Sequence, residues 1–144
     1  HPPAPAPNSY SFYLKKKLSS ICTDTFSRGT MFTHEKFDAY KLAIEFSKIA
    51  LELADELPVG HSTIRDQLKR ASLSIPLNIA EGTGKNSQVD RRRFYAIARG
   101  SAMECAAICD IIRLIDKRYF TSTEEGKLKL KSIVSILSVI CSSK

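Results

Sequence analysis

The chain has 144 residues, of which 43% are hydrophobic and 26% charged, and its formal net charge is +7 at pH 7. This composition is typical of one globular domain and excludes both a disordered protein and a chain with room for two full domains. No hydrophobic run approaches the roughly 20 residues that cross a bilayer, and the excess of Lys and Arg favours an anionic partner.

The first 30 residues differ in composition from the rest of the chain. Residues 1–11 are rich in Pro and Ala, which favours a flexible polyproline-like segment. We therefore predict that residues 1–30 are a disordered or non-native leader, such as upstream read-through or a processed extension, and that the domain covers residues 31–144. The alternative is that the basic cluster Lys15–Lys17 forms a nucleic-acid-binding arm.

Hydrophobic residues then recur at helical spacing in two segments before the middle of the chain. The first segment follows Thr33, a candidate N-cap, and ends at Pro58. The second follows Ser62 or Thr63, and Gly82 with the nearby Gly84 closes it. The sequence predicts one long helix in each segment.

Two further helices are expected in the second half of the chain. Ser87 is the candidate cap of the third helix and Thr121 of the fourth. Four long helices joined by short loops predict an all-α, antiparallel up-down four-helix bundle. Pro76 lies inside the second helix, so we expect a Pro kink there.

The fourth helix is hydrophobic nearly all round. From Ile133 to Ile140 only Ser135 and Ser138 are polar. A bundle needs one hydrophobic stripe per helix, so we expect a subunit interface to cover the extra face.

Three motifs resemble a known family. Residues 70–85, RASLSIPLNIAEGTGK, are similar to the signature of the four-helix bundle proteins encoded in intervening sequences of 23S (large-subunit) ribosomal RNA. Residues 94–104, FYAIARGSAME, resemble the second motif of that family, and residues 40–44, YKLAI, resemble the opening of its first helix. The resemblance covers about residues 35–120.

The resemblance implies a small cytoplasmic bacterial protein without known catalytic activity. It also implies a homopentamer, as in the related accessory variability determinant proteins of diversity-generating retroelements. Those proteins are basic and bind nucleic acid and a reverse transcriptase. RNA or DNA, a reverse transcriptase or another protein, and further copies of the chain are thus the partners to consider, since a shared fold does not fix a function.

Polar residues of the motifs are spaced to share helix faces. Asn78 and Glu81 are three residues apart, as are Ser101 and Glu104. If both pairs face inward, they form a buried structural polar network that must be fully hydrogen-bonded. The predicted network comprises Arg70, Asn78, Glu81, Ser101 and Glu104.

The alternative for the two glutamates is a metal or acid–base site. Helical di-metal sites need four carboxylates with Glu-x-x-His pairs. The three histidines, His1, His34 and His61, lie in no such pair. We therefore predict no metal, no cofactor and no enzymatic activity.

Positive charge concentrates in residues 65–99, which contain eight Lys or Arg against three Asp or Glu, a net charge of +5. The start of the third helix offers free backbone amides and the positive end of a helix dipole, which suit a phosphate. The predicted nucleic-acid-binding residues are Lys85, Arg91, Arg92, Arg93 and Arg99. A simple solvated face is the alternative, and one nearby aromatic residue, Tyr95, does not make a base-stacking platform.

The loop from Gly82 to Ser87 only superficially resembles a phosphate-binding loop. A P-loop requires Ser or Thr after its Lys and a strand before its glycines. Here Asn86 follows Lys85 and a helix precedes the glycines, so nucleotide hydrolysis is not expected.

The four cysteines, Cys22, Cys105, Cys109 and Cys141, lack the spacing of a zinc site and are expected to be reduced. Cys105 and Cys109 should lie in the core. The sequence thus predicts a non-enzymatic oligomeric module that binds the backbone of RNA or DNA. The alternative is a protein-binding structural or regulatory scaffold.

Overall fold

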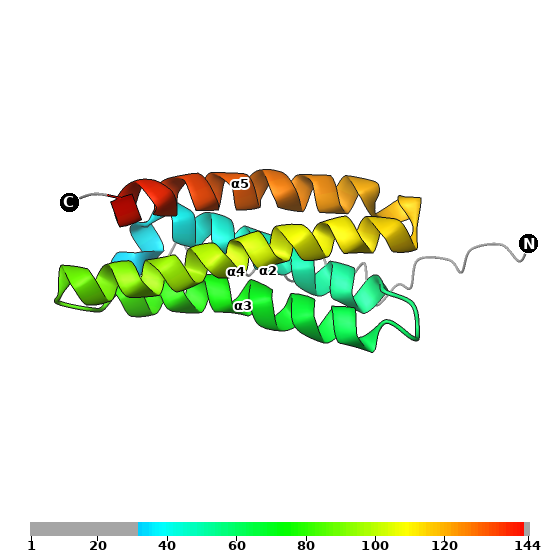
Figure 1. The fold of residues 1–144 in the computed structure, drawn as a ribbon, viewed down its shortest axis with the longest axis horizontal. Coiled ribbons are helices and arrows are strands. Elements are labelled where there is room, and N and C mark those ends of the chain that lie inside the picture. Colours follow the sequence, from blue (N-terminus) through cyan, green and yellow to red (C-terminus); the bar gives the residue numbers. More distant parts are fainter. Residues whose placement is uncertain (1–31, 143–144) are drawn as a thin grey trace, which may run out of the picture. The chain divides into compact units, whose positions relative to one another are not determined.

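The computed structural model describes residues 32–142. All the helices discussed below lie in the unit Thr33–Lys144 (Figure 1). The predicted leader and the Lys15–Lys17 cluster lie outside the described residues.

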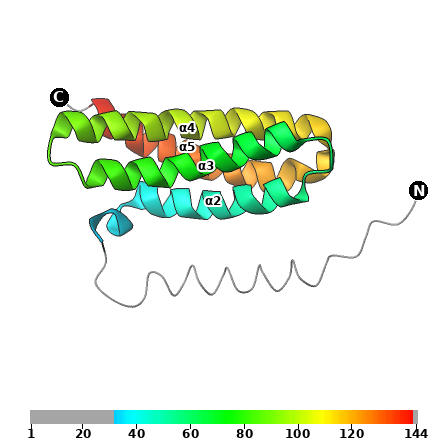
Figure 2. The same cartoon turned by 90° about the horizontal axis from the view of Figure 1, so that it is seen from below.

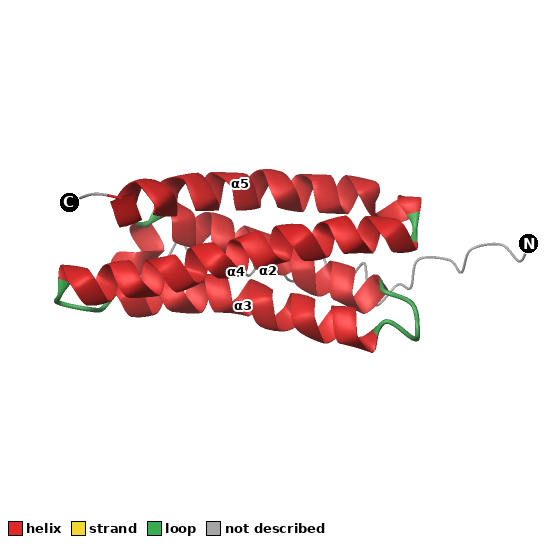
Figure 3. Ribbon diagram, viewed as in Figure 1, coloured by secondary structure: helices red, strands yellow, loops and turns green. Residues whose placement is uncertain are grey.

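Four long helices form an all-α bundle, and the described part of the chain contains no strand (Figure 3). Successive helices run antiparallel, and each packs mainly on two neighbours, so that α2 and α4 lie diagonally across the bundle (Figure 2). The predicted four-helix bundle is confirmed. Its elements are η1 (Thr33–Lys36), α2 (Asp38–Glu56), α3 (Ser62–Thr83), α4 (Gln88–Ile115), η2 (Lys117–Tyr119) and α5 (Phe120–Ser142).

Three of the four predicted helix caps are wrong. Thr33 lies in the 3-10 helix η1, and α2 begins after Phe37, which makes no side-chain cap. Ser62 is already helical in α3, and Thr121 follows the first residue of α5. Ser87 does cap α4, because its Oγ accepts a hydrogen bond from the Asp90 amide at 3.4 Å. Short 3-10 turns before α2 and α5 therefore replace two of the three expected caps.

The core is built from one face of each helix. Phe46 of α2 is fully buried and lies against Gly126 of α5, where a Cβ would approach the Phe46 ring to 3.1 Å. This contact lets α2 and α5 approach closely. Other large side chains with less than 2% exposure are Leu68, Ile75, Ile79, Ile112, Leu130, Ile133 and Leu137.

Helix α3 continues without a break through Pro76. Proline has no amide hydrogen, so the carbonyl of Ser72, four residues earlier, lacks its usual donor. The Ser47 hydroxyl of α2 donates a hydrogen bond to that carbonyl at 3.2 Å, and both serines are buried. A neighbouring helix thus satisfies the group that proline leaves unpaired.

Cys105 and Cys109 lie in the core, as predicted, and are free thiols. Burial raises the pKa of both, that of Cys109 to about 11. Cys141 is partly exposed, and Cys22 lies outside the described residues.

These buried thiols should make the bundle less stable at alkaline pH. Above pH 9 the unfolded chain releases thiol protons that the folded chain keeps, so unfolding becomes easier as pH rises toward 11. We expect the free energy of unfolding of the wild-type protein to fall between about pH 8 and 10, as measured by urea unfolding. This fall should be about 2 kcal/mol larger than that of the variant Cys105→Ala/Cys109→Ala. Equal losses in the two proteins would contradict this expectation.

No helix within residues 32–142 is long and hydrophobic enough to cross a membrane.

Candidate nucleic-acid interface

The predicted basic residues gather around the corner between α3 and α4. Gly82 brings the two helices together, since a Cβ there would lie 2.9 Å from Cε1 of Tyr95 and 3.0 Å from Cβ of Phe94. Tyr95 is only 5% exposed, and its hydroxyl hydrogen-bonds to that of Thr83 at 2.9 Å. Tyr95 is therefore an anchor of the corner and is not available to stack on bases.

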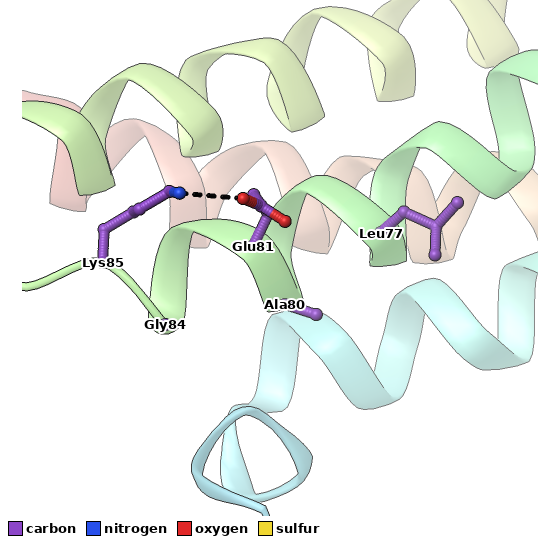
Figure 4. Close-up of a pocket in the computed structure, with 5 residues that line it drawn as sticks. All are labelled: Leu77, Ala80, Glu81, Gly84 and Lys85. Carbon is purple, nitrogen blue, oxygen red and sulfur yellow. Dashed lines mark ion pairs between the residues drawn. The ribbon is translucent and has the colours of Figure 1, made fainter.

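Lys85 and Arg91 both have partners inside the corner. The Lys85 ammonium lies 2.9 Å from a carboxylate oxygen of Glu81 (Figure 4). It also lies 5.2 Å from the centre of the Phe94 ring. The Arg91 guanidinium donates to the Lys85 carbonyl at 2.9 Å, while its Nε is buried and has no hydrogen-bond partner among residues 32–142. Lys85 and Arg91, two of the five predicted nucleic-acid-binding residues, thus stabilise the loop between α3 and α4.

Arg92, Arg93 and Arg99 form no ion pair with any residue that the structure describes. Arg92 and Arg99 are seven residues apart on α4 and share a face, where both are partly exposed, whereas Arg93 is exposed. Their charge is open to a ligand. We call these three residues the α4 arginines.

Two other cations of the +5 segment, Arg65 and Lys69, have structural partners. Arg65 hydrogen-bonds to carbonyls at the end of α2, and Lys69 pairs with Asp55 at 3.1 Å. Only some of the cations in residues 65–99 are therefore available to bind an anion.

A polar network does link α3 to α4, with a different membership from the predicted one. The Asn78 amide donates to the carbonyl and hydroxyl of Ser74, at 2.8 and 3.0 Å. The Ser74 hydroxyl in turn lies 2.9 Å from that of Ser101. Ser74 therefore connects Asn78 to Ser101. The predicted network did not include Ser74, although its position four residues before Asn78 places the two side chains on the same helix face.

The prediction that Glu81 and Glu104 face inward is wrong for the single chain. Both are exposed, as is Arg70. Ile79 of α3 is fully buried, and Glu81 is two residues beyond it, about 200° around the helix, so its side chain is turned away from the core.

The two glutamates make no metal site. Within residues 32–142 no three His, Cys, Asp or Glu side chains are grouped so that they could hold a metal ion. A shallow surface depression next to Glu81 is lined by Leu77, Ala80, Glu81, Gly84 and Lys85, all from the end of α3 and the following loop (Figure 4).

These features define a small helical bundle protein with a tight α3–α4 corner and with arginines on α4 that form no ion pair within the described part of the chain. The family model described as "23S rRNA-intervening sequence protein" matches residues 35–139, which include most of α5. The chain belongs to this family, as its motifs indicated. A search of curated proteins finds no match to the chain.

Proposed function

We propose that this protein is a non-enzymatic, oligomeric module that binds the phosphate backbone of RNA or DNA. The observation that carries the proposal is the set of α4 arginines, which have no ion-pair partner among the described side chains. Unpaired arginines on a chain of net charge +7 attract phosphates and release counterions from the nucleic acid.

Binding of this kind should read little sequence. Tyr95 is buried, and the Lys85 ammonium lies over the ring of Phe94, the other aromatic residue of the corner, so base stacking there is not expected. Arginine contacts to phosphate fix the position of a nucleic acid without reading its bases.

Salt dependence tests the proposal. We expect wild-type protein to bind unrelated RNA and DNA oligonucleotides in a fluorescence-anisotropy titration, with affinity falling as salt rises from about 50 to 300 mM. Arg92→Ala/Arg99→Ala should bind more weakly at low salt, and the slope of log K against log salt should fall by about one per lost phosphate contact.

The matched control is Lys127→Ala/Lys129→Ala, which removes two cations that pair with Asp110 and Glu45 on the bundle surface. It changes the net charge equally, so a general charge effect would affect both variants alike. Unchanged affinity and slope in the arginine variant would show that the α4 arginines are only a solvated face.

The second candidate function is a protein-binding scaffold. The observation that favours it is a row of exposed hydrophobic residues on α4, among them Met103, 60% exposed, and Leu114, 85% exposed. Absence of nucleic-acid binding by wild-type protein at low salt would support this function. A reverse transcriptase would then be the first protein to test, because the family resemblance implies it.

Self-association is part of the proposal, with a homopentamer as the state that the resemblance implies. Exposed hydrophobic side chains on both α4 and α5, such as Leu114 and Leu128, support an oligomer. A bacterial, cytoplasmic origin is likewise implied by the resemblance alone.

A further inference from the structure

Helix α4 has a second hydrophobic face, which points away from the core. Its outward positions recur every three or four residues and are mostly hydrophobic. The exposed charged residues Arg93, Glu104 and Asp110 lie at its start, within it and at its margin, respectively. Ile97 is 44% exposed and Ile111 47%. We call this face the outer α4 stripe, and it comprises Ala96, Ile97, Gly100, Met103, Ala107, Ile111 and Leu114.

Gly100 is the least expected residue of the stripe. It lies near the middle of α4, where glycine costs about 0.5–1 kcal/mol relative to alanine. A Cβ at Gly82 or Gly126 would press on a neighbour, but a Cβ at Gly100 would meet nothing within 4 Å. Nothing in the described chain requires a glycine at this position, whereas a side chain arriving from outside would fit over it.

Helix α3 presents side chains that match this stripe. Leu77 is 66% exposed and Leu73 is 42% exposed, so both project from α3. Arg70, one turn earlier, is exposed and forms no ion pair with a described residue. Glu104 on α4 is likewise exposed and has no ion-pair partner among residues 32–142. The two helices thus carry complementary shapes and opposite unpaired charges.

The heights of these residues along the bundle also agree. Ser74 is level with Ser101, and Thr83 with Tyr95, because their hydroxyl groups are 2.9 Å apart in each pair. Because the two helices are antiparallel, each step forward along α3 corresponds to a step backward along α4. Leu77 is therefore at the height of Gly100 to within one turn. By the same count Arg70 falls within one turn of Glu104.

We propose that α3 of a second copy of this chain packs on the outer α4 stripe, with Leu77 of the second copy over Gly100 and Arg70 of the second copy paired with Glu104. The proposal rests on the self-association proposed above and assigns its surface. If the symmetry axis of a ring is parallel to the bundle, all copies lie at the same height along that axis. Residues of α3 and α4 that are at the same height in one chain are then also at the same height in neighbouring copies.

This contact is heterologous, since each copy uses α4 toward one neighbour and α3 toward the other. Such contacts can close into a ring. All α3–α4 corners would then lie at one end of the ring, which would repeat the α4 arginines around the axis. Repetition of a weak phosphate site raises the avidity for a long nucleic acid.

Sedimentation velocity of the full chain tests the contact. Wild type should sediment as an oligomer, and Gly100→Gln should sediment near the 16.0 kDa of one chain, because the larger side chain would occupy the place of the leucine. Helicity by circular dichroism should not change, since the space around Gly100 is open in the single chain. The matched control is Ser135→Gln at an exposed position of α5, which should remain oligomeric.

A charge exchange provides the second test. Arg70→Glu and Glu104→Arg should each raise the dissociation constant of the oligomer by about tenfold or more, and the double variant should recover most of the loss. If wild type is an oligomer and none of these variants dissociates, the assignment of the surface is wrong while self-association stands.

Two other results would also overturn the assignment. Dissociation of Ser135→Gln together with Gly100→Gln would place α5 rather than α3 on the stripe. A monomeric wild type at micromolar concentration would reject self-association itself, and the salt titration above would still decide nucleic-acid binding.

Discussion

Gly82→Ala is expected to lower the free energy of unfolding by about 2–3 kcal/mol, because its new Cβ has no space. The nearest atoms are Cε1 of Tyr95 at 2.9 Å and Cβ of Phe94 at 3.0 Å. The Phe94 Cβ is fixed to the backbone of α4, and the hydroxyl of Tyr95 is hydrogen-bonded to Thr83. Neither neighbour can move without separating α3 from α4.

Thermal unfolding followed by circular dichroism measures this effect, which should lower Tm by about 8–15 °C. Gly84→Ala is the matched control. Its Cβ would lie at ordinary contact distance, 3.5 Å from the Glu81 carbonyl, and its backbone has a φ of −77°, which alanine readily adopts. A control that is destabilised as much as Gly82→Ala would mean that loss of glycine flexibility, not space, limits the corner.

Hydrophobic periodicity was sufficient to predict the fold, because each helix buries one face. It placed all four helices in the right order and gave their approximate ends. It could not predict the 3-10 helices η1 and η2, since a turn of three or four residues has no periodicity of its own. The predicted caps at Thr33 and Thr121 were wrong for that reason.

The candidate site was less predictable, because the direction of a polar side chain depends on how two helices meet. Spacing placed Asn78 and Glu81 on one helix face, but only Asn78 points toward the seam with α4. The same limit applies to charge. Lys85 and Arg91 were predicted to contact nucleic acid. In the structure Lys85 forms an ion pair with Glu81, and Arg91 donates a hydrogen bond to a loop carbonyl.

The exposed hydrophobic surface shows a third limit. The sequence assigned the extra hydrophobic face to Ile133–Ile140 of α5, where Val139 is 70% exposed whereas Ile133 and Leu137 are fully buried. The structure adds a longer exposed stripe on α4, which includes Ile97 at 44% exposure and which the sequence analysis did not predict. One residue of rotation about a helix turns a side chain by about 100°, so spacing alone does not separate two faces of a helix that is hydrophobic on both.

Arg65 illustrates a structural role that charge counting did not reveal. Helix α2 has no basic residue in its last turn, and Leu57 and Pro58 follow it in place of a glycine cap. Arg65 of α3 reaches across and donates from Nε to the Ala54 carbonyl at 3.0 Å and from Nη2 to the Leu57 carbonyl at 2.8 Å. One side chain thereby caps the end of α2 and places a positive charge at the negative end of its dipole.

Arg65→Ala is accordingly expected to lower the free energy of unfolding by about 2–3 kcal/mol, because hydrogen bonds from a charged donor are lost and two carbonyls are left without it. Arg65→Lys keeps the charge but cannot make both bonds, so it should fall between the alanine variant and wild type. Lys69→Ala is the control, because its ion pair with Asp55 is on the surface and should contribute less than about 0.5 kcal/mol. Urea unfolding of the three variants decides the matter. Equal stability of Arg65→Ala and Lys69→Ala would show that solvent caps α2 as well as the arginine does.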